Sequence, residues 1–227
     1  MQEEFERTAL LLGEDAIPSL QNSTVAVFGL GGVGSYVCEA LARAGVGSLV
    51  LVDNDTVSKS NINRQLYALH STVGRLKTEV AKERILDIQP GCSVKTYPLF
   101  FLPETADQID FSCFDYVVDA IDTVSGKLCI IKKACSMGIP VISCMGTGNK
   151  LHPELLEIAE LSETSVCPLA RVMRRECKAL QLEHIKVVYS KEPPLSSGSG
   201  VPGSVSFVPS AAGLLLASEV IRHITSK

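Results

Sequence analysis

The hydrophobic residues of this chain fall into two kinds of segment. Short apolar runs at 25–28, 48–53 and 114–122 predict strands that are buried on both faces, the pattern of a parallel sheet. Longer segments at 35–45 and 72–90 place apolar residues three or four positions apart, which is typical of amphipathic helices. Strands and helices alternate along the chain, so we expect βαβ units with right-handed crossovers.

Two more strands, at 93–99 and 139–146, and a helix at 124–138 extend this alternation. Residues 1–22 precede it as a short helical lead-in. The chain up to residue 148 therefore predicts an α/β fold with a doubly wound, Rossmann-like and mainly parallel sheet.

The last third of the chain has a different pattern. Two strands, at 155–161 and 185–190, flank a helix at 167–180, and an apolar helix follows at 211–224. We expect these strands to extend the sheet as an antiparallel C-terminal part.

The whole chain, 1–227, has the length of one large domain. We divide it into a nucleotide-binding core at 22–148 and a C-terminal part at 149–227. Within the second part, residues 191–204 are rich in proline, glycine and serine and poor in apolar groups, which predicts a mobile loop.

Charge and cysteine content narrow the class of protein. The net charge is −4, and the acidic start MQEEFER lacks the apolar core of a signal peptide. The best candidate for a membrane span, 211–221, is short and interrupted by Ser218 and Glu219. None of the eight cysteines forms a C-x-x-C pair, which argues against a zinc ribbon. We therefore expect a cytoplasmic protein with free thiols and no membrane partner.

A glycine-rich turn follows the first predicted strand. In GLGGVG, Gly29, Gly31 and Gly34 have the spacing G-x-G-x-x-G, with Gly32 between them. Such a turn lets backbone N–H groups approach a phosphate at a helix N-terminus. Asp53 ends the next strand, where a carboxylate meets ribose hydroxyls. The pattern predicts an adenine nucleotide without identifying which one.

Polar residues accumulate beyond Asp53, in DNDTVSKSNINRQ and shortly after it. Ligands of open α/β sheets bind at the carboxyl ends of the strands, so we expect these residues to line one crevice. Cations there can stabilise charge on a triphosphate, and a carboxylate can hold a magnesium ion that bridges phosphate oxygens. This favours nucleotidyl transfer over hydride transfer. The residues are Asp53, Asp55, Asn61, Arg64, Gln65, Lys77 and Asp122.

Four motifs together resemble the ThiF/MoeB family of adenylating proteins, which are similar to ubiquitin-activating enzymes. They are GLGGVGS, LVDNDTVSKSNINRQ, VGRLKTEVAKERI and VVDAIDT, and the resemblance covers most of residues 5–148. It implies ATP and Mg²⁺ as cofactors and adenylation of a carboxylate. It also implies that Asn61, Arg64 and Lys77 contact the triphosphate and that Asp122 holds the metal.

The same resemblance implies a homodimer. Members of the family reach the ATP of the partner subunit with an N-terminal arginine, and Arg7 in FERTALLLG occupies the matching place. The simpler alternative for Arg7 is a surface arginine on a frayed helix.

Within the family, the zinc-free branch that dehydrates threonylcarbamoyladenosine in tRNA is most similar over nearly the whole chain. This implies ATP-dependent cyclisation of the modified nucleoside beside the anticodon, with the tRNA anticodon loop as partner. The alternative substrate is the C-terminal carboxylate of a sulfur-carrier or ubiquitin-like protein, and a sulfur-transfer protein is a further candidate partner. An NAD-dependent oxidoreductase and a catalytically silent nucleotide-binding scaffold are weaker alternatives.

Two features of the C-terminal part stay open. Cys167, directly before a predicted helix, is either a nucleophile with a lowered pKa or an ordinary capping residue. Between Cys167 and Lys191, six basic residues against two acidic ones give a local charge of +4. They form either a solvated helix face or a surface for tRNA. The residues expected on one helix face are Arg171, Arg174, Arg175 and Lys178.

Overall fold

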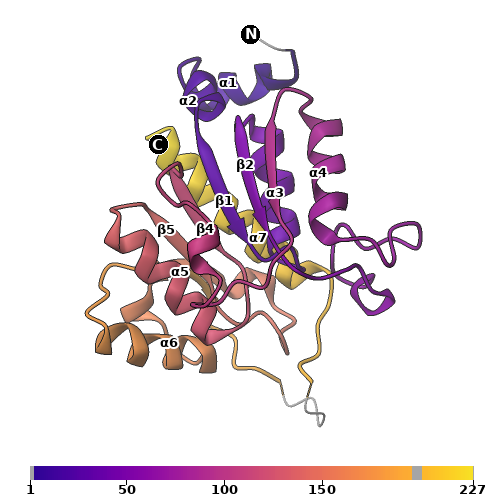
Figure 1. Cartoon of the computed structure of the whole chain (residues 1–227). Coiled ribbons are helices and arrows are strands. Elements are labelled where there is room, and N and C mark those ends of the chain that lie inside the picture. Colours follow the sequence, from indigo (N-terminus) through magenta and orange to yellow (C-terminus); the bar gives the residue numbers. More distant parts are fainter. Residues whose placement is uncertain (1–2, 196–200, 227) are drawn as a thin grey trace.

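A seven-stranded sheet forms the centre of the molecule (Figure 1). The computed structural model describes residues 3–195 and 201–226. The strand order is β3-β2-β1-β4-β5-β7-β6. The strands are β1 (Thr24–Phe28), β2 (Ser48–Val52), β3 (Ser93–Tyr97), β4 (Tyr116–Asp119), β5 (Val141–Cys144), β6 (Leu156–Glu160) and β7 (Lys186–Ser190).

Helices cover both faces of this sheet. One face carries α3, α4 and α7, and the other carries α5 and α6. The helices are α1 (Glu6–Leu12), α2 (Ala16–Gln21), α3 (Gly34–Ala44), α4 (Lys77–Ile88), α5 (Val124–Ser136), α6 (Pro168–Ala179) and α7 (Phe207–Ile224).

The predicted fold class is confirmed. Neighbouring strands from β3 to β7 are parallel, and only β6, on the edge beside β7, runs antiparallel. Alternation along β1 serves two cores, because Val25 and Val27 pack on one face while Ala26 and Phe28 pack on the other. The continuous apolar runs of the sequence reflect this burial on both faces.

Two predicted helices begin at different residues. The helix expected at 72–90 begins at Lys77, because the residues before it pair with the segment that follows β2. There Val57 donates its N–H to the Arg75 carbonyl at 2.8 Å. The helix expected at 211–224 begins at Phe207, with Pro209 in its first turn, where a missing N–H costs nothing.

Helix α7 is also longer than the apolar segment considered as a membrane span. Its 18 residues meet the length and composition of a membrane-crossing helix. However, Leu216, Ala217 and Val220 are fully buried and α7 packs against α3, so it is a core helix in this structure.

The Pro/Gly/Ser-rich segment is only partly described. Residues 196–200, the middle of the predicted mobile loop, lie outside the described residues. Its flanks are held: Leu195 donates its N–H to the Asn149 carbonyl at 2.8 Å, and Gly203 donates to Asn149 Oδ1 at 2.6 Å.

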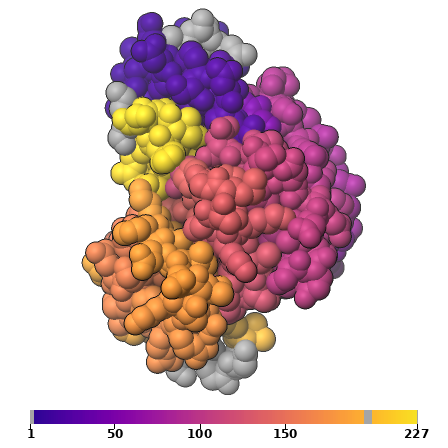
Figure 2. Space-filling model, turned by 60° about the vertical axis from the view of Figure 1, so that its left-hand side comes forward, coloured from indigo at the N-terminus to yellow at the C-terminus, as the bar shows by residue number. Residues whose placement is uncertain are grey.

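Helices α1 and α2 lie at the amino end of the sheet, away from the carboxyl ends of the strands (Figure 1). Phe5, Ala9 and Ile17 form a small core there. Figure 2 shows the C-terminal end of α7 (yellow) between these helices (indigo) and the orange part of the chain. Leu10 and Leu11 on α1 are 87% and 85% exposed, which is unusual for two adjacent leucines.

Candidate functional site

A crevice of about 370 Å³ opens at the carboxyl ends of β1, β2 and β4. The connections from β1 and β4 leave toward opposite faces of the sheet, which makes this the point where α/β sheets bind ligands. The crevice brings together every predicted site residue except Gly34 and Arg7. Those lining it are Gly29, Gly31, Gly32, Asp53, Asp55, Asn61, Arg64, Gln65, Lys77 and Asp122.

The glycine turn is shaped by two close approaches. Gly29 has φ +87°, and a Cβ there would lie 2.7 Å from the Ala120 carbonyl oxygen. A Cβ on Gly34 would lie 1.8 Å from the Gly29 carbonyl oxygen, so α3 begins directly on the turn. No side chain caps the N-terminus of α3. Gly34 therefore supports the glycine turn without lining the crevice, and the N-terminus of α3 is free to bind an anion.

Asp53 connects the turn to the polar segment. Its Oδ2 accepts the N–H of Leu30 at 2.6 Å, and its Oδ1 accepts the N–H of Asp55 at 2.8 Å. Burial raises the pKa of Asp53 above its ordinary value, although the Lys77 ammonium and these two N–H groups favour the ionised form. The carboxylate is thus fixed at the crevice wall, where a ribose hydroxyl can donate to it.

Lys77 and Asp55 form an ion pair at 2.7 Å on the crevice wall. Lys77 stands at the first position of α4, and its N–H bonds to the Asp55 carbonyl at 3.0 Å. The Lys77 side chain is 5% exposed, whereas that of Asp55 is 58% exposed. The buried methylene groups of Lys77 therefore hold its ammonium in place, and its ion-pair partner Asp55 is in contact with solvent.

Arg64, near the end of the polar segment, lies against the glycine turn. Its Nη1 donates to the Ser60 carbonyl at 3.0 Å and to Asn63 Oδ1 at 2.9 Å. Its Cγ lies 3.4 Å from where a Cβ on Gly32 would be, so the guanidinium stem lies against the glycine turn. Among the described residues it forms no ion pair. A half-buried, unpaired guanidinium next to a phosphate cradle is suited to bind anionic oxygen.

Asn61 and Gln65 are adjacent to this arginine. Asn61 Oδ1 accepts the Ser58 N–H at 3.1 Å, which closes a capping box around a short 3₁₀ turn. Gln65 is 9% exposed and its Nε2 lies 3.7 Å from where a Cβ on Gly31 would be. Asn61 thus has a structural task in addition to the ligand contact predicted for it.

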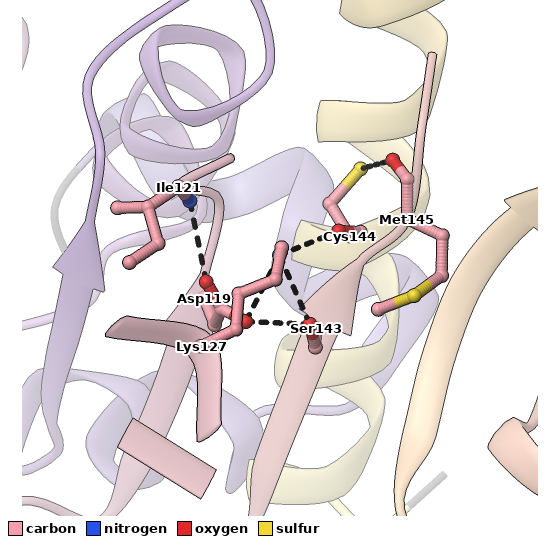
Figure 3. Close-up of polar contacts among 6 residues, drawn as sticks. All are labelled: Asp119, Ile121, Lys127, Ser143, Cys144 and Met145. Atoms are coloured by element: carbon pink, nitrogen blue, oxygen red, sulfur yellow. Dashed lines mark hydrogen bonds and ion pairs between the residues drawn. The ribbon is translucent and has the colours of Figure 1, made fainter. Parts of the chain in front are cut away.

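A buried polar cluster beneath the crevice was not predicted (Figure 3). Lys127 Nζ donates to Asp119 Oδ2 at 3.0 Å, to Ser143 Oγ at 3.2 Å and to the Cys144 carbonyl at 2.7 Å. Lys127, Asp119 and Ser143 all have 0% exposure. Ser143 Oγ donates to Asp119 Oδ2 at 2.5 Å, and Asp119 Oδ1 accepts the N–H of Ile121 at 3.2 Å. The cluster therefore joins the ends of β4 and β5 to the loop that carries Asp122.

Asp122 itself lies in this loop and not in the strand. Strand β4 ends at Asp119, three residues earlier than the sequence pattern indicated. The Asp122 side chain is exposed and faces the crevice, as expected from its position after the strand. Asp119, at the end of β4, is fully buried in the cluster, so Asp122 is the accessible carboxylate of the loop after this strand.

A second chamber of about 350 Å³ continues from the crevice toward β5 and α6. Cys167 lines it at the N-cap of α6 and is 2% exposed. No histidine lines the chamber among the described residues. The chamber therefore offers Cys167 no imidazole base, and its role as a nucleophile stays a prediction. The residues common to both spaces are Val33, Ala120, Ile121, Asp122 and Thr147.

The basic residues of α6 line a groove of about 800 Å³ on the outer side of the C-terminal part. Arg171, Arg174, Arg175 and Lys178 share this groove, as their spacing predicted. They are not equivalent. Arg174 is half-buried and donates to the Thr164 carbonyl at 2.7 Å. Arg171, Arg175 and Lys178 are exposed, and of these Arg175 pairs with Glu176 at 2.5 Å.

Arg7 is exposed on α1, at the end of the sheet opposite to the crevice (Figure 1). It does not reach the crevice of its own chain.

Comparison with known proteins gives a consistent result. The family model described as "ThiF family" matches residues 5–227. The chain is 40% identical over 242 aligned residues to the tRNA threonylcarbamoyladenosine dehydratase of Bacillus subtilis, covering 99% of this chain and 95% of that protein. It is 38% identical to the Escherichia coli dehydratase over 78% of this chain and 66% of that protein.

Solved structures show the same similarity. The E. coli dehydratase TcdA in complex with AMP has a TM-score of 0.93 at 32% identity, covering 99% of this chain and 94% of that one. The ATP complex of the same protein has a TM-score of 0.91 at 32% identity, with the same coverage.

Proposed function

The chain belongs to the ThiF family, and on this premise we propose that it is an ATP-dependent dehydratase that cyclises N6-threonylcarbamoyladenosine in tRNA. The observation that carries the proposal is the similarity to the B. subtilis dehydratase over 99% of this chain and 95% of that protein. The enzyme adenylates the carboxylate of the modified nucleoside and needs ATP for this step.

The crevice supplies what adenylation requires. The glycine turn and the N-terminus of α3 hold phosphate, and Asp53 accepts from the ribose. Arg64 and Lys77 stabilise the charge that develops on the leaving pyrophosphate. A carboxylate oxygen of the substrate attacks the α-phosphorus of ATP, and the bond from that phosphorus to the β-phosphate oxygen breaks.

Cyclisation follows from the resulting mixed anhydride. A nitrogen or the carbonyl oxygen of the ureido group in the threonylcarbamoyl modification attacks the activated carbonyl carbon. A ureido N–H proton is lost, and AMP leaves with the former carboxylate oxygen. The nucleoside has then lost one water, and no enzyme nucleophile is needed because proximity makes the attack intramolecular.

Asp122 is the residue proposed to hold Mg²⁺. Among the described residues no group of three or more metal-ligating side chains exists. This fits magnesium, which is commonly held by one or two carboxylates together with substrate phosphates. When bound, the ion would neutralise charge on the phosphate oxygens.

The test is nucleoside mass spectrometry of tRNA before and after incubation with protein and ATP. We expect the threonylcarbamoyl nucleoside to lose one water in an ATP-dependent manner. An Arg64→Ala variant should be slower by a factor of about 10² to 10³, the usual cost of removing one group that stabilises transition-state charge. Wild-type protein that leaves the nucleoside intact would disprove the proposal.

The second candidate substrate is a sulfur-carrier protein. It is favoured by 42% identity to the adenylyltransferase and sulfurtransferase UBA4 of Vanderwaltozyma polyspora, which covers 58% of this chain but 30% of that protein. ATP–pyrophosphate exchange that requires a Gly-Gly-tailed protein and ignores tRNA would support it. A sulfur-transfer partner belongs to the same candidate.

A homodimer in the cytoplasm is the proposed form of the enzyme. Arg7 cannot serve its own crevice from the far end of the sheet, and the exposed Leu10 and Leu11 beside it provide apolar surface for a second subunit. If Arg7 acts in trans, mixing inactive Arg7→Ala and Arg64→Ala proteins should restore up to about a quarter of the wild-type activity, because one of the mixed sites is intact. Activity that stays at the level of the separate variants would contradict this.

The groove on α6 is the proposed contact for tRNA. Its cations extend from the second chamber along α6, and phosphate contacts by such residues position a nucleic acid without reading its sequence.

A further inference from the structure

Lys150 is the one cation that lines the second chamber among the described residues. It is 4% exposed, although a charged ammonium is rarely buried without a counter-charge. Lys150 is not among the predicted site residues, and the reaction described above does not use it. A buried cation at the wall of a chamber next to an ATP crevice needs an explanation.

The hydrogen bonds of Lys150 do not include a salt bridge, and Glu192 acts on its charge only from beyond ion-pair distance. Nζ donates to the backbone carbonyl of Glu192. The carboxylate of Glu192 is used elsewhere, because it accepts the N–H groups of Leu151 at 2.9 Å and His152 at 3.0 Å. Among the described residues no carboxylate lies within ion-pair distance of Lys150 Nζ. An ammonium has three donors, so two remain for a group in the chamber.

Backbone geometry holds this lysine in position. Asn149, the residue before it, has φ +58°, a conformation that is uncommon outside glycine. Three hydrogen bonds hold it: its N–H to the Gly203 carbonyl at 2.8 Å, its Oδ1 from the Gly203 N–H at 2.6 Å, and its carbonyl from the Leu195 N–H at 2.8 Å. Strained residues of this kind cluster at sites where a side chain must be aimed.

The chamber is connected to the crevice by the loop that carries Asp122. Ala120, Ile121 and Asp122 line both spaces. A group held in the chamber is therefore separated only by this loop from the crevice in which the nucleotide is proposed to bind.

We propose that the second chamber binds the threonyl carboxylate of the modified nucleoside and that the Lys150 ammonium is its anchor. This inference rests on the proposed function. It assigns to Lys150 a carboxylate in direct contact, which the described part of the chain does not supply because Glu192 acts only from beyond ion-pair distance. Burial lowers the pKa of Lys150, and a bound carboxylate opposes this shift by favouring the ammonium.

The anchor acts before and during adenylation. The ammonium donates a hydrogen bond to one carboxylate oxygen, and the other oxygen is left free to attack the α-phosphorus of ATP. No proton is transferred in this step, and pyrophosphate is the leaving group. Once the anhydride has formed, its carbonyl oxygen is the atom that Lys150 contacts, so the same donor polarises the carbonyl for cyclisation.

The test is a binding cycle that does not depend on turnover. Anticodon stem-loop RNA with the threonylcarbamoyl group and the same RNA with unmodified adenosine are titrated into wild-type and Lys150→Met protein in the absence of ATP. We expect wild-type protein to prefer the modified RNA by roughly tenfold to a hundredfold, the contribution of a charged hydrogen bond. Lys150→Met should lose this preference while its affinity for unmodified RNA stays unchanged.

Two further variants separate the charge from the fold. Lys150→Arg keeps the charge and should recover part of the preference. Lys132→Met removes an exposed lysine of α5 that lines neither the crevice, nor the second chamber, nor the α6 groove, and it should behave as wild type. Lys150→Met should also lose roughly tenfold to a hundredfold in kcat/KM for the RNA while its affinity for ATP is retained.

The outcomes distinguish this inference from the proposed function. A Lys150→Met protein that still prefers modified RNA would disprove the anchor while leaving the dehydratase function intact. Wild-type protein that binds modified and unmodified RNA with equal affinity would also disprove the anchor and leave the dehydratase function intact. Wild-type protein that does not dehydrate the nucleoside at all would overturn the function and the inference together.

Discussion

Two lysine–aspartate pairs lie at the carboxyl end of the sheet and differ in their exposure to solvent. Lys77 and Asp55 pair at 2.7 Å on the crevice wall, where the aspartate is 58% exposed. Lys127 and Asp119 pair at 3.0 Å beneath the crevice with both side chains at 0% exposure. The residue types are identical, so the difference in role comes from what else each lysine contacts.

Lys127 has no donor left for a ligand, whereas Lys77 has. The three protons of Lys127 reach Asp119, Ser143 and the Cys144 carbonyl. Lys77 Nζ has one bond, to Asp55, among the described residues. A saturated buried lysine fixes the positions of two strands, and a lysine with spare donors is available to bind phosphate. Hydrogen-bond saturation therefore separates the structural lysine from the lysine that is proposed to contact phosphate.

The largest expected effect is on Lys127. Replacing it by methionine leaves Asp119 buried without its counter-charge, and breaking a buried pair in this way costs about 3 to 5 kcal/mol. The measurement is the free energy of unfolding in denaturant. A double variant, Lys127→Met with Asp119→Leu, should regain a part of the loss, because it leaves no unpaired charge. If the free energy of unfolding of Lys127→Met lies within about 1 kcal/mol of the wild-type value, well below the range for buried pairs, the cluster does not hold β4 and β5 together.

The next effect is on Lys77 and concerns catalysis. We expect Lys77→Met to reduce kcat/KM by a factor of about 10² to 10³, because the charge on the triphosphate loses a preorganised partner. Its free energy of unfolding should change by less than about 1 kcal/mol, since Asp55 is left in water. Lys82→Met, which removes an exposed lysine of the same helix outside the crevice, is the matched control and should retain most of the activity. A Lys77→Met protein with a much lower free energy of unfolding but normal adenylation would show that Lys77, like Lys127, has a structural role.

The smallest effect extends the comparison to the α6 groove. Arg174 is bonded to Thr164, while Arg171 and Lys178 are exposed. We expect Arg171→Glu with Lys178→Glu to weaken tRNA binding and to reduce the slope of log affinity against log salt by about 0.7 to 0.9 per lost phosphate contact. Arg174→Gln should instead affect stability. An unchanged salt slope in the double variant would remove the groove from the tRNA surface.

The parts of the fold that could be predicted are those set by local pattern. Apolar runs predicted the parallel strands, and the spacing of Gly29, Gly31 and Gly34 with Asp53 predicted where the crevice lies. Each of these signals lies within one βαβ unit, where neighbours in sequence are neighbours in space.

The missed features depend on contacts between distant segments. The start of α4 at Lys77 follows from pairing with residues after β2, which overrides helical spacing. Lys127 shares the helix face of the buried Ile130, Ile131 and Ala134, so its burial was detectable from spacing alone. Its partners were not, because Asp119 and Ser143 come from two strands whose order in the sheet the sequence leaves open. Lys150 gave no pattern at all, since its position depends on an unusual backbone angle at Asn149.

The position of α7 has a consequence for how the protein is made. Most of the crevice is encoded before residue 124, yet Ser204 and Pro209 complete its wall, and α7 covers the apolar face of α3. A ribosome adds the intervening hundred residues in roughly 5 to 20 s. During that interval the nascent chain exposes an unfinished core. Chains released before α7 lack part of the crevice wall and the helix that covers the core, so incomplete products expose apolar surface to chaperones and proteases.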